Sequence, residues 1–394
     1  MFAILSTIRK PLRILMLPLF AMMLAACDPA MMGGLGGAGG PKIDPKAPVP
    51  VALLIPRGGS ASDNLLAKNL ENAARMAIRD LDGVQIDLRV YGTAGKASTA
   101  ATAASQAVAD GAKIILGPVY GEAANAAGVA VASSGVNVLS FSNNSTIAGG
   151  NVFVLGPTFD TTAKRLVSYA KRAGKDKIVV LHANDIGGQL ARNAIQRAIS
   201  ANGATLSGDI EYALSQESVR AAVPRVKATI ESSGANALFM TANSATALPL
   251  LAEMLPAAGV RNATSQFVGM TRWDIPAQTL AIPGIQGGWF ALPDPSATAA
   301  FAARYNAAYG ARPLDIAGLA FDGVAAIGSL VKSGRANALT GSALTQNAGF
   351  RGANGIFRLR SDGTNERGLA VATIRNNQVV LLEQAPKAFG GAGF

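Results

Sequence analysis

The sequence predicts an α/β protein with two doubly wound, parallel-sheet lobes and a cleft between them. Short apolar runs alternate with helical patterns along the chain, which is typical of parallel sheets covered by helices on both faces. After about five such units the alternation starts again near residue 160, which indicates a second lobe. The length of 394 residues suits two domains of ordinary size.

The first set of elements begins with the apolar run 49–55, which predicts a buried strand followed by the loop 56–60. Apolar residues recur at a spacing of three and four over residues 63–81, as they do on one face of a helix. Residues 84–90 alternate apolar and polar, as a strand does. The rest of this set is predicted as a helix at 97–110, a strand at 113–116, a helix at 121–133, and strands at 136–141 and 151–155.

The second set begins with a predicted helix at 161–173. It continues with strands at 177–182, 204–212, 237–241, 266–270 and 287–292, and with helices at 189–201, 216–232, 245–257, 296–309 and 315–332. From about residue 355 the pattern predicts a β-hairpin region, with strands at 355–359, 368–375 and 378–382. The turns between these strands are expected at 361–363 and at Asn376-Asn377.

Residues 1–26 have the pattern of an export signal. Three basic residues precede an apolar stretch of 13 residues, Ile14 to Ala26, which is shorter than the roughly 20 residues that a membrane-spanning helix needs. The stretch ends in Leu24-Ala25-Ala26-Cys27, which resembles the lipobox of bacterial lipoproteins. The resemblance implies that Cys27, the only cysteine, carries a lipid anchor in the bacterial cell envelope, facing the periplasm. Asp28 resembles an inner-membrane retention signal.

Removing the signal lowers the formal net charge from +11 to +8, because 32 Lys and Arg then face 24 Asp and Glu. These basic residues form no run of four or more, so we expect no nucleic-acid partner. A mild positive charge suits a protein held beside an anionic envelope. Residues 27–48 are rich in Gly and Pro and predict a disordered tether, and residues 387–394 predict a flexible tail.

The residue counts argue against catalysis. One Cys and one His exclude an intramolecular disulfide and a two-His metal site, and we expect no metal, no cofactor and no enzymatic activity. Ser168…Lys171 and Ser329…Lys332 match the SxxK pattern of penicillin-binding enzymes, but the chain has no KTG and both matches fall in predicted helices. His182 ends a strand, where a hydrogen-bonded residue at the cleft rim is favoured over a catalytic base.

Segments spread over about residues 49–385 carry a family resemblance. They are Val51-Ala52-Leu53-Leu54-Ile55-Pro56, the helical stretch 69–77, Ile115-Leu116-Gly117-Pro118, Val138-Leu139-Ser140-Phe141-Ser142, Phe350…Gly352…Gly355 and Asp362-Gly363. In this order and spacing they resemble the type I periplasmic binding proteins, the branched-chain amino-acid receptor group. The resemblance implies crossings between the lobes near residues 157, 286 and 345. Lobe 1 would hold 49–157 and 287–345, and lobe 2 would hold 158–286 and 346–386.

Ligands of doubly wound sheets bind at the carboxyl ends of the strands. The loop after the strand 136–141 offers Ser140, Ser142, Asn143 and Asn144 as donors for an anion, and a polar turn with capping side chains is the alternative. The resemblance implies that this loop and the loop at Tyr120-Gly121-Glu122 bind the carboxylate of an amino acid. Gly121 stands where many family members have serine.

Four further candidates follow predicted strands. Arg57 and Arg272 are candidates for binding a carboxylate through two guanidinium nitrogens, and a solvated position at the rim is the alternative for each. Trp273, together with Tyr120, is a candidate for enclosing an apolar or ring-shaped ligand, and ordinary packing within a lobe is the alternative. Asp185 is a candidate partner for a ligand amine.

The function expected from these features is solute binding by a membrane-tethered lipoprotein. The two lobes would close on a small polar ligand, amino-acid-like or peptide-like, and present it to an ABC-type permease. A narrower resemblance supplies the alternative. The lipobox, the tether and the altered ligand loops are also similar to those of penicillin-binding protein activator lipoproteins, which regulate peptidoglycan synthesis by contacting a synthase.

Overall fold

The computed structural model describes residues 40–390. Cys27, the expected signal and most of the expected tether lie outside the described residues, as do residues 391–394. Within the described part, no helix combines the length and the apolar character that crossing a membrane requires.

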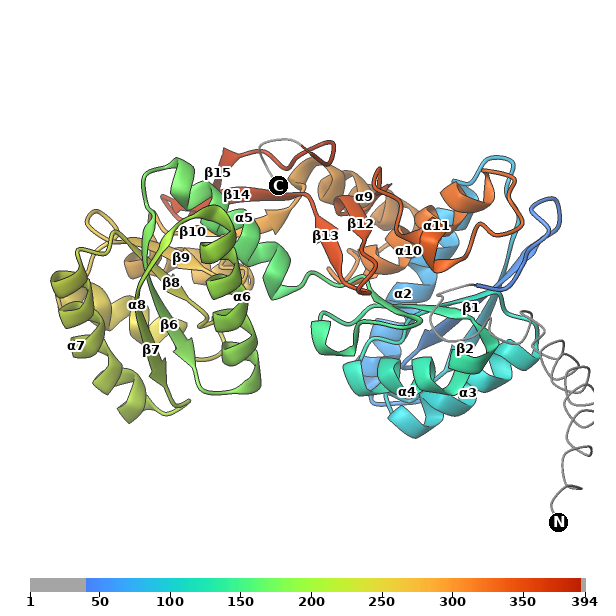
Figure 1. Ribbon diagram of the computed structural model, residues 1–394, viewed down its shortest axis with the longest axis horizontal. Helices are drawn as coiled ribbons and strands as arrows, with labels where there is room; N and C mark the ends of the chain where they lie inside the picture. The colour runs from blue at the N-terminus through green and yellow to red at the C-terminus, as the bar shows by residue number, and fades with distance from the viewer. Residues whose placement is uncertain (1–39, 391–394) are drawn as a thin grey trace, which may run out of the picture. The chain divides into compact units, whose positions relative to one another are not determined.

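The first lobe is built on a five-stranded parallel sheet with the order β2-β1-β3-β4-β5. Its strands are β1 (Val49–Ile55), β2 (Ile86–Gly92), β3 (Ile114–Leu116), β4 (Asn137–Ser140) and β5 (Val152–Val154). The intervening helices are α2 (Ala61–Arg79), α3 (Ala97–Ala109) and α4 (Gly121–Val131). Because side chains alternate along a strand, Leu53 of β1 enters the core shared with α2, whereas Leu54 enters the core shared with α3 and α4. Figure 1 shows α3 and α4 side by side on that face.

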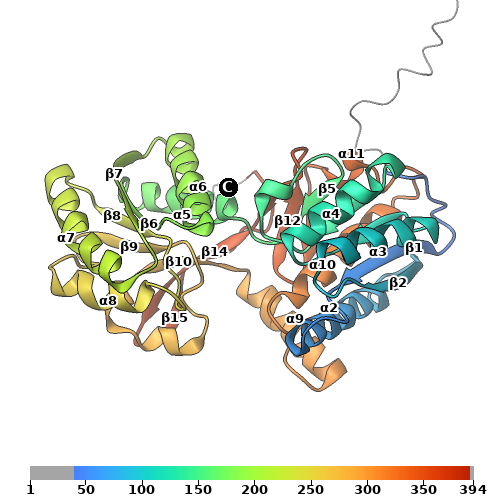
Figure 2. The same ribbon diagram turned by 90° about the horizontal axis from the view of Figure 1, so that it is seen from below.

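The second lobe is built on a seven-stranded sheet with the order β15-β14-β10-β9-β8-β6-β7. Its strands are β6 (Lys177–Ala183), β7 (Thr205–Tyr212), β8 (Ala237–Met240), β9 (Gln266–Gly269), β10 (Trp289–Pro293), β14 (Leu369–Arg375) and β15 (Gln378–Glu383). Its helices are α5 (Phe159–Arg172), α6 (Ile186–Asn202), α7 (Gln216–Ser233) and α8 (Leu248–Ala257). Helices α5 and α6 pack on one face of the sheet and α7 and α8 on the other (Figure 2).

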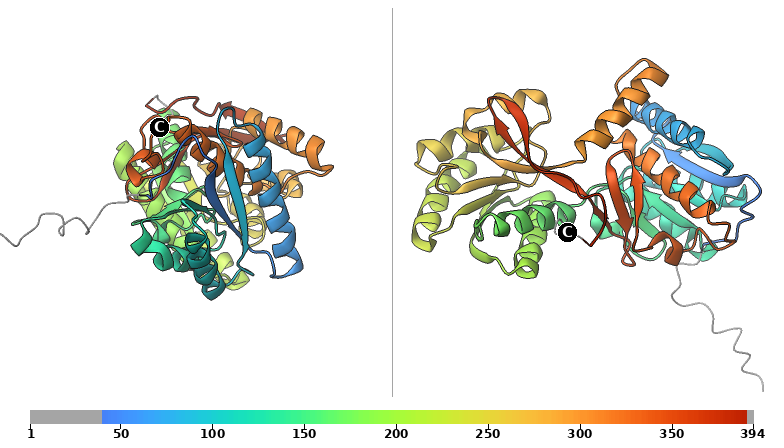
Figure 3. Two further views of the ribbon diagram at one scale, coloured as in Figure 1. Left: turned by 90° about the vertical axis from the view of Figure 1, so that its right-hand side faces the viewer. Right: turned by 90° about the horizontal axis from the view of Figure 1, so that it is seen from above.

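The segment between β10 and β14 returns to lobe 1. It contains α9 (Pro295–Tyr309), α10 (Ala317–Val331), α11 (Gly341–Leu344), β11 (Phe350–Gly352), β12 (Gly355–Leu359) and β13 (Asn365–Arg367). The three strands form a small antiparallel sheet with β12 in the centre, and its apolar side chains join the core that α2 and α10 share. Figure 3 shows this small sheet beside α10. Short 3-10 helices lie at Ala132–Ser134, Ser145–Ile147, Ala277–Ala281 and Pro283–Ile285.

Two of the expected crossings are displaced. Strand β10 pairs with β9 and β14, so residues 287–293 belong to lobe 2 rather than to lobe 1. Residues 346–367 belong to lobe 1, because Phe350 and Phe357 fill its core. The chain therefore leaves lobe 2 after β10 and returns between β13 and β14. The crossing at 157 lies between β5 and α5, as expected.

The predicted hairpin region is divided between two sheets. Strand β12 pairs with β11 and with the unpredicted strand β13, and it does not pair with the strand that begins at residue 369. Strands β14 and β15 form the expected hairpin, with Arg375 opposite Gln378. Asn376 and Asn377 both have positive φ, at 52° and 60°, as a two-residue hairpin turn of this kind requires.

Both ends of the folded body extend into segments expected to be unstructured. Ile43, in the expected tether, is buried in the lobe 1 core, and its N–H donates to the carbonyl of Ala336 at 2.9 Å. In the expected tail, Lys387 pairs with Asp294, and the guanidinium of Arg358 lies 4.6 Å from the ring centre of Phe389. These apolar and charged contacts anchor residues that composition alone assigns to disorder.

Candidate functional site

Three loops at the carboxyl edge of the first sheet meet around the start of α4. The loop after β1 ends at Ser60, which caps α2, and Asp63 completes a capping box by accepting a hydrogen bond from the Ser60 N–H at 3.0 Å. The Tyr120 hydroxyl, from the loop after β3, also donates to Asp63. This hydrogen bond lowers the pKa of Asp63 and raises the pKa of Tyr120. Asp63 is not among the site residues predicted from the sequence, although the spacing Ser60-x-x-Asp63 is a capping signal.

The loop after β4 is held by its own side chains. The buried Ser140 hydroxyl donates to the Pro118 carbonyl at 3.0 Å and accepts from the Ser142 N–H at 3.1 Å. The Asn144 side-chain oxygen accepts hydrogen bonds from the N–H and the hydroxyl of Thr146, at 2.9 and 2.8 Å. For Ser140 and for the Asn144 oxygen, the capping alternative is therefore correct. Asn143 is exposed.

Hydrogen-bond donors remain free where this loop meets α4. The N-cap of α4, Tyr120, forms no side-chain capping bond, so the first N–H groups of the helix are uncapped. A Cβ on Gly121 would lie 3.3 Å from Asn144 Nδ2 and 3.6 Å from Ser142 Oγ, which places both polar atoms beside the helix start. Within residues 40–390, neither Asn144 Nδ2 nor the Ser142 hydroxyl donates a hydrogen bond. These donors and the helix dipole suit a carboxylate or another anion.

The charged candidates Asp185, Arg57 and Arg272 are occupied by local partners. Asp185 caps α6 by accepting from the Gly188 N–H at 2.7 Å. Arg57 forms an ion pair with Glu71, and its side chain is half exposed. Arg272 binds Asp274 through two nitrogens. A ligand would have to compete with each of these contacts.

Trp273 is buried within lobe 2 and cannot enclose a ligand. It has no exposed surface, and its ring lies against Gly269 and Gly288, where a Cβ would come within 2.4 Å of the indole. Its ring centre is 6.5 Å from that of Phe290. The prediction of a ligand-stacking tryptophan is wrong, because two glycines of β9 and the loop before β10 leave room for the indole in the core.

Exposed apolar side chains gather at the carboxyl edges of both sheets. In lobe 1, Leu65 and Tyr120 are exposed near the ends of β1 and β3. In lobe 2, Ile186, Leu214 and Ile275 follow β6, β7 and β9 and are 80%, 52% and 41% exposed. These five make up most of the exposed large apolar residues of the described chain. They provide apolar surface beside the edges where ligands of doubly wound sheets bind. Apolar residues shortly after the strand ends, in loops or in the first turns of the following helices, are the signal that could have identified them.

His182 has a structural role. It is buried, its Nε2 lies 3.0 Å from Asp209 Oδ1, and its Nδ1 lies 3.1 Å from the Ala183 carbonyl. Asp209 of β7 orients the imidazole of His182. Residues 40–390 contain no cluster of three or more His, Cys, Asp or Glu side chains suited to a metal ion.

Two surface hollows lie away from the candidate site. One, of about 640 Å³, is beside α6 at residues 193–201, and another, of about 590 Å³, lies between α10, β11 and residues 387–389. Neither includes a residue of the candidate site. The site is therefore defined by its converging donors and apolar side chains rather than by either hollow.

Comparison with known proteins agrees with this architecture. The sequence profile of the family described as "Periplasmic binding protein" matches residues 48–378. A search of curated protein sequences found no match. The structure is similar to that of a putative branched-chain amino acid ABC transporter from Rhodospirillum rubrum, with a TM-score of 0.72 and 17% identity, covering 85% of this chain and 100% of that one.

Two further similar structures contain bound ligands. An ABC transporter substrate-binding protein from Desulfitobacterium hafniense in complex with leucine has a TM-score of 0.63 and 18% identity, covering 85% of this chain and 100% of that one. A solute binding protein of an ABC transporter from Rhodopseudomonas palustris, in complex with 3,4-dihydroxy benzoic acid, has a TM-score of 0.59 and 17% identity, covering 86% and 96%. With a family match over most of its length, this chain belongs to the periplasmic binding protein family and has the type I fold.

Proposed function

We propose that this protein is a periplasmic solute-binding protein of ABC-type transport whose ligand is a small carboxylic acid. The observation that carries the proposal is the convergence of the uncapped α4 N-terminus, Ser142 Oγ and Asn144 Nδ2. A carboxylate matches these donors in charge and in hydrogen-bonding capacity. Leucine and 3,4-dihydroxybenzoic acid, bound by the two relatives, have the carboxylate as their shared group.

The rest of the ligand is apolar in this proposal. Ile186, Leu214 and Ile275 expose apolar surface on lobe 2, and Tyr120 exposes a ring on lobe 1. Closure of the lobes would bury these side chains against an aliphatic or aromatic body. The favoured ligands are therefore amino acids with large apolar side chains, or aromatic acids, rather than polar peptides.

A ligand screen tests this function. A carboxylic acid present at 100 times its Kd is expected to raise the free energy of unfolding by about 2.7 kcal/mol. Ser142→Ala is expected to weaken that ligand about 10- to 100-fold, because a hydrogen bond to a charged group contributes about 1.5–3 kcal/mol. The measurement is thermal unfolding and calorimetric titration with leucine, isoleucine, benzoate and 3,4-dihydroxybenzoate.

The control is Ser98→Ala, on the exposed face of α3, which should leave affinity unchanged. Equal affinities of the Ser142→Ala variant and the unaltered protein would contradict the site. Failure of every carboxylic acid, combined with capture of a purified peptidoglycan synthase, would favour the activator function instead.

We also propose that Cys27 tethers the protein to the membrane. The basis is the Leu24-Ala25-Ala26-Cys27 sequence after a short apolar stretch. In the bacterial host, the full chain is expected to partition into the detergent phase of a Triton X-114 extraction, and Cys27→Ser should move it to the aqueous phase. Asp28→Asn is the matched control and should stay in the detergent phase. Identical partition of the Cys27→Ser variant and the unaltered chain would contradict the anchor.

A further inference from the structure

Strand β13 is attached firmly to lobe 1. The Asn365 side-chain amide donates to the carbonyls of Val154 and Gly156, both at 2.8 Å. Arg367 forms an ion pair with Asp322 of α10 at 2.8 Å, and both side chains are almost completely buried. Because side chains alternate along a strand, Glu366 points away from these two residues. Glu366 therefore belongs to lobe 1 and faces the α5 side.

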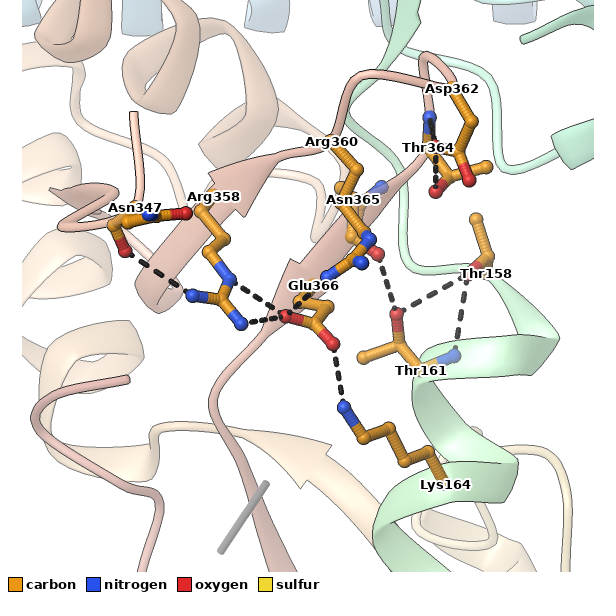
Figure 4. Close-up of polar contacts among 10 residues, drawn as sticks. All are labelled: Thr158, Thr161, Lys164, Asn347, Arg358, Arg360, Asp362, Thr364, Asn365 and Glu366. Atoms are coloured by element: carbon orange, nitrogen blue, oxygen red, sulfur yellow. Dashed lines mark hydrogen bonds and ion pairs between the residues drawn. The ribbon is translucent and has the colours of Figure 1, made fainter. Parts of the chain in front are cut away.

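Three cations surround the Glu366 carboxylate. Lys164 of α5 lies 2.6 Å from Oε1, while Arg358 of β12 and Arg360 lie 2.5 and 3.2 Å from Oε2 (Figure 4). Burial raises the pKa of Glu366, but the hydrogen bonds from Lys164 and Arg358 outweigh burial, and the pKa lies below the ordinary value of 4.5. Glu366 is thus an ionised, nearly buried carboxylate with more cationic partners than its charge requires.

Only one of the three cations belongs to lobe 2. Arg358 lies in β12 and Arg360 directly follows that strand, so both belong to lobe 1 with Glu366. Lys164 comes from α5, the first helix after the crossing. The start of α5 is fixed at the crossing, because the Thr161 hydroxyl donates to the Asn365 carbonyl at 3.2 Å. Lys164 lies about one turn farther along the helix. A rotation of lobe 2 about this crossing would therefore separate Lys164 from Glu366 while the Thr161 contact acts as the pivot.

We propose that the Lys164–Glu366 ion pair is a breakable link that sets the lobe arrangement, with Arg358 and Arg360 keeping Glu366 paired when Lys164 leaves. A buried carboxylate without a partner is strongly unfavourable, so an isolated pair here would resist lobe rotation. Because Arg358 and Arg360 stay beside Glu366, the carboxylate keeps ionic partners when the lobes rotate. The ammonium of Lys164, which is already half exposed, is then hydrated by water. Lys164 is therefore a positioning residue that does not touch the ligand.

The link is connected to the candidate ligand site through Gly156. Its carbonyl accepts from Asn365 next to Glu366, and its N–H donates to the Ser142 carbonyl at 3.1 Å. A change in lobe arrangement at β13 is thus transmitted by two hydrogen bonds to the loop that carries Ser142. The predicted effect on ligand affinity rests on the proposed function, but the effect on lobe arrangement does not.

The test measures the distance between the lobes without ligand. The full chain carries Cys27→Ser, which removes the only thiol, together with Val129→Cys on α4 and Lys227→Cys on α7, two exposed positions in different lobes. Spin labels on the two new cysteines report the distance distribution by pulsed electron paramagnetic resonance. Lys164→Ala should change the ratio of short- to long-distance populations about two- to fivefold, the range set by a solvent-accessible ion pair.

Two matched variants separate the link from a general loss of charge. Arg360→Ala removes one of the cations that hold Glu366 when Lys164 leaves, so it should shift the distribution in the direction opposite to Lys164→Ala. Lys164→Arg, which retains the cation, should leave the distribution unchanged. Raising NaCl from 0.05 to 1 M should shift the unaltered distribution toward that of Lys164→Ala. The proposal would be overturned by coincident distributions of Lys164→Ala and the parent at low salt, or by a shift of Arg360→Ala in the same direction as that of Lys164→Ala. Neither outcome depends on whether a carboxylic acid binds.

Discussion

Replacing Asp322 by alanine is expected to lower the free energy of unfolding by about 3–5 kcal/mol. The Asp322 carboxylate has no exposed surface and lies 2.8 Å from the guanidinium of Arg367, whose side chain is only 4% exposed. It also accepts the N–H of Ala353 at 2.7 Å. The variant would leave a buried cation and a buried N–H without their partner, so the loss exceeds that of an ordinary ion pair.

Urea unfolding followed by far-ultraviolet circular dichroism measures this effect, because both tryptophans lie in lobe 2 and do not report on lobe 1. The control is Asp82→Ala, which removes an ion pair with Lys332 at 3.4 Å in which the side chains are 96% and 62% exposed. That change should cost less than about 1 kcal/mol. Similar losses of unfolding free energy in Asp322→Ala and Asp82→Ala would contradict the prediction that burial makes the Asp322–Arg367 pair important for stability.

Replacing Trp273 by alanine is expected to destabilise lobe 2 by about 3–5 kcal/mol, the usual cost of removing a large aromatic side chain from a core. Trp273 is fully buried, and Gly269 and Gly288 beside its ring have no side chains that could fill the cavity left by the indole. The fluorescence of Trp289, the other tryptophan, follows the unfolding of lobe 2 in urea.

Trp273→Phe should retain more of the stability than Trp273→Ala, because a smaller cavity remains. Ligand affinity, measured where both proteins are folded, should be the same for Trp273→Phe and for the unaltered protein. If Trp273→Phe lost ligand affinity without losing stability, Trp273 would be a ligand-binding residue rather than a residue of the lobe 2 core.

The periodicity of the sequence predicted most helices and strands, because that information lies within a few neighbouring residues. The β1 strand is an example, since its apolar run requires burial on both faces of a sheet. The Asn376-Asn377 turn is another, because Asn tolerates positive φ better than most residues do. The family resemblance implied that the loops at 120–122 and 142–145 bind one ligand together. The physical reason why such loops can meet is that parallel strands end at one edge of a sheet.

The lobe boundaries could not be predicted in the same way. An apolar strand such as β10 fits either sheet, and only its pairing with β9 and β14 decides which lobe it joins. The short strand β13 has polar side chains and no periodic signal. Its position depends on contacts with residues as distant in sequence as Val154 and Gly156.

The sequence by itself determined the α/β class, the order of most elements and the edge of the sheet where donors gather, and it predicts an export signal at residues 1–26. The tertiary structure decided which charged and aromatic groups remain available. In the tertiary structure Trp273 is buried between two glycines, and Lys164 contacts Glu366 across the crossing. The physical reason is that local periodicity depends on near neighbours, whereas burial and ion pairing depend on which distant segments the two sheets bring together.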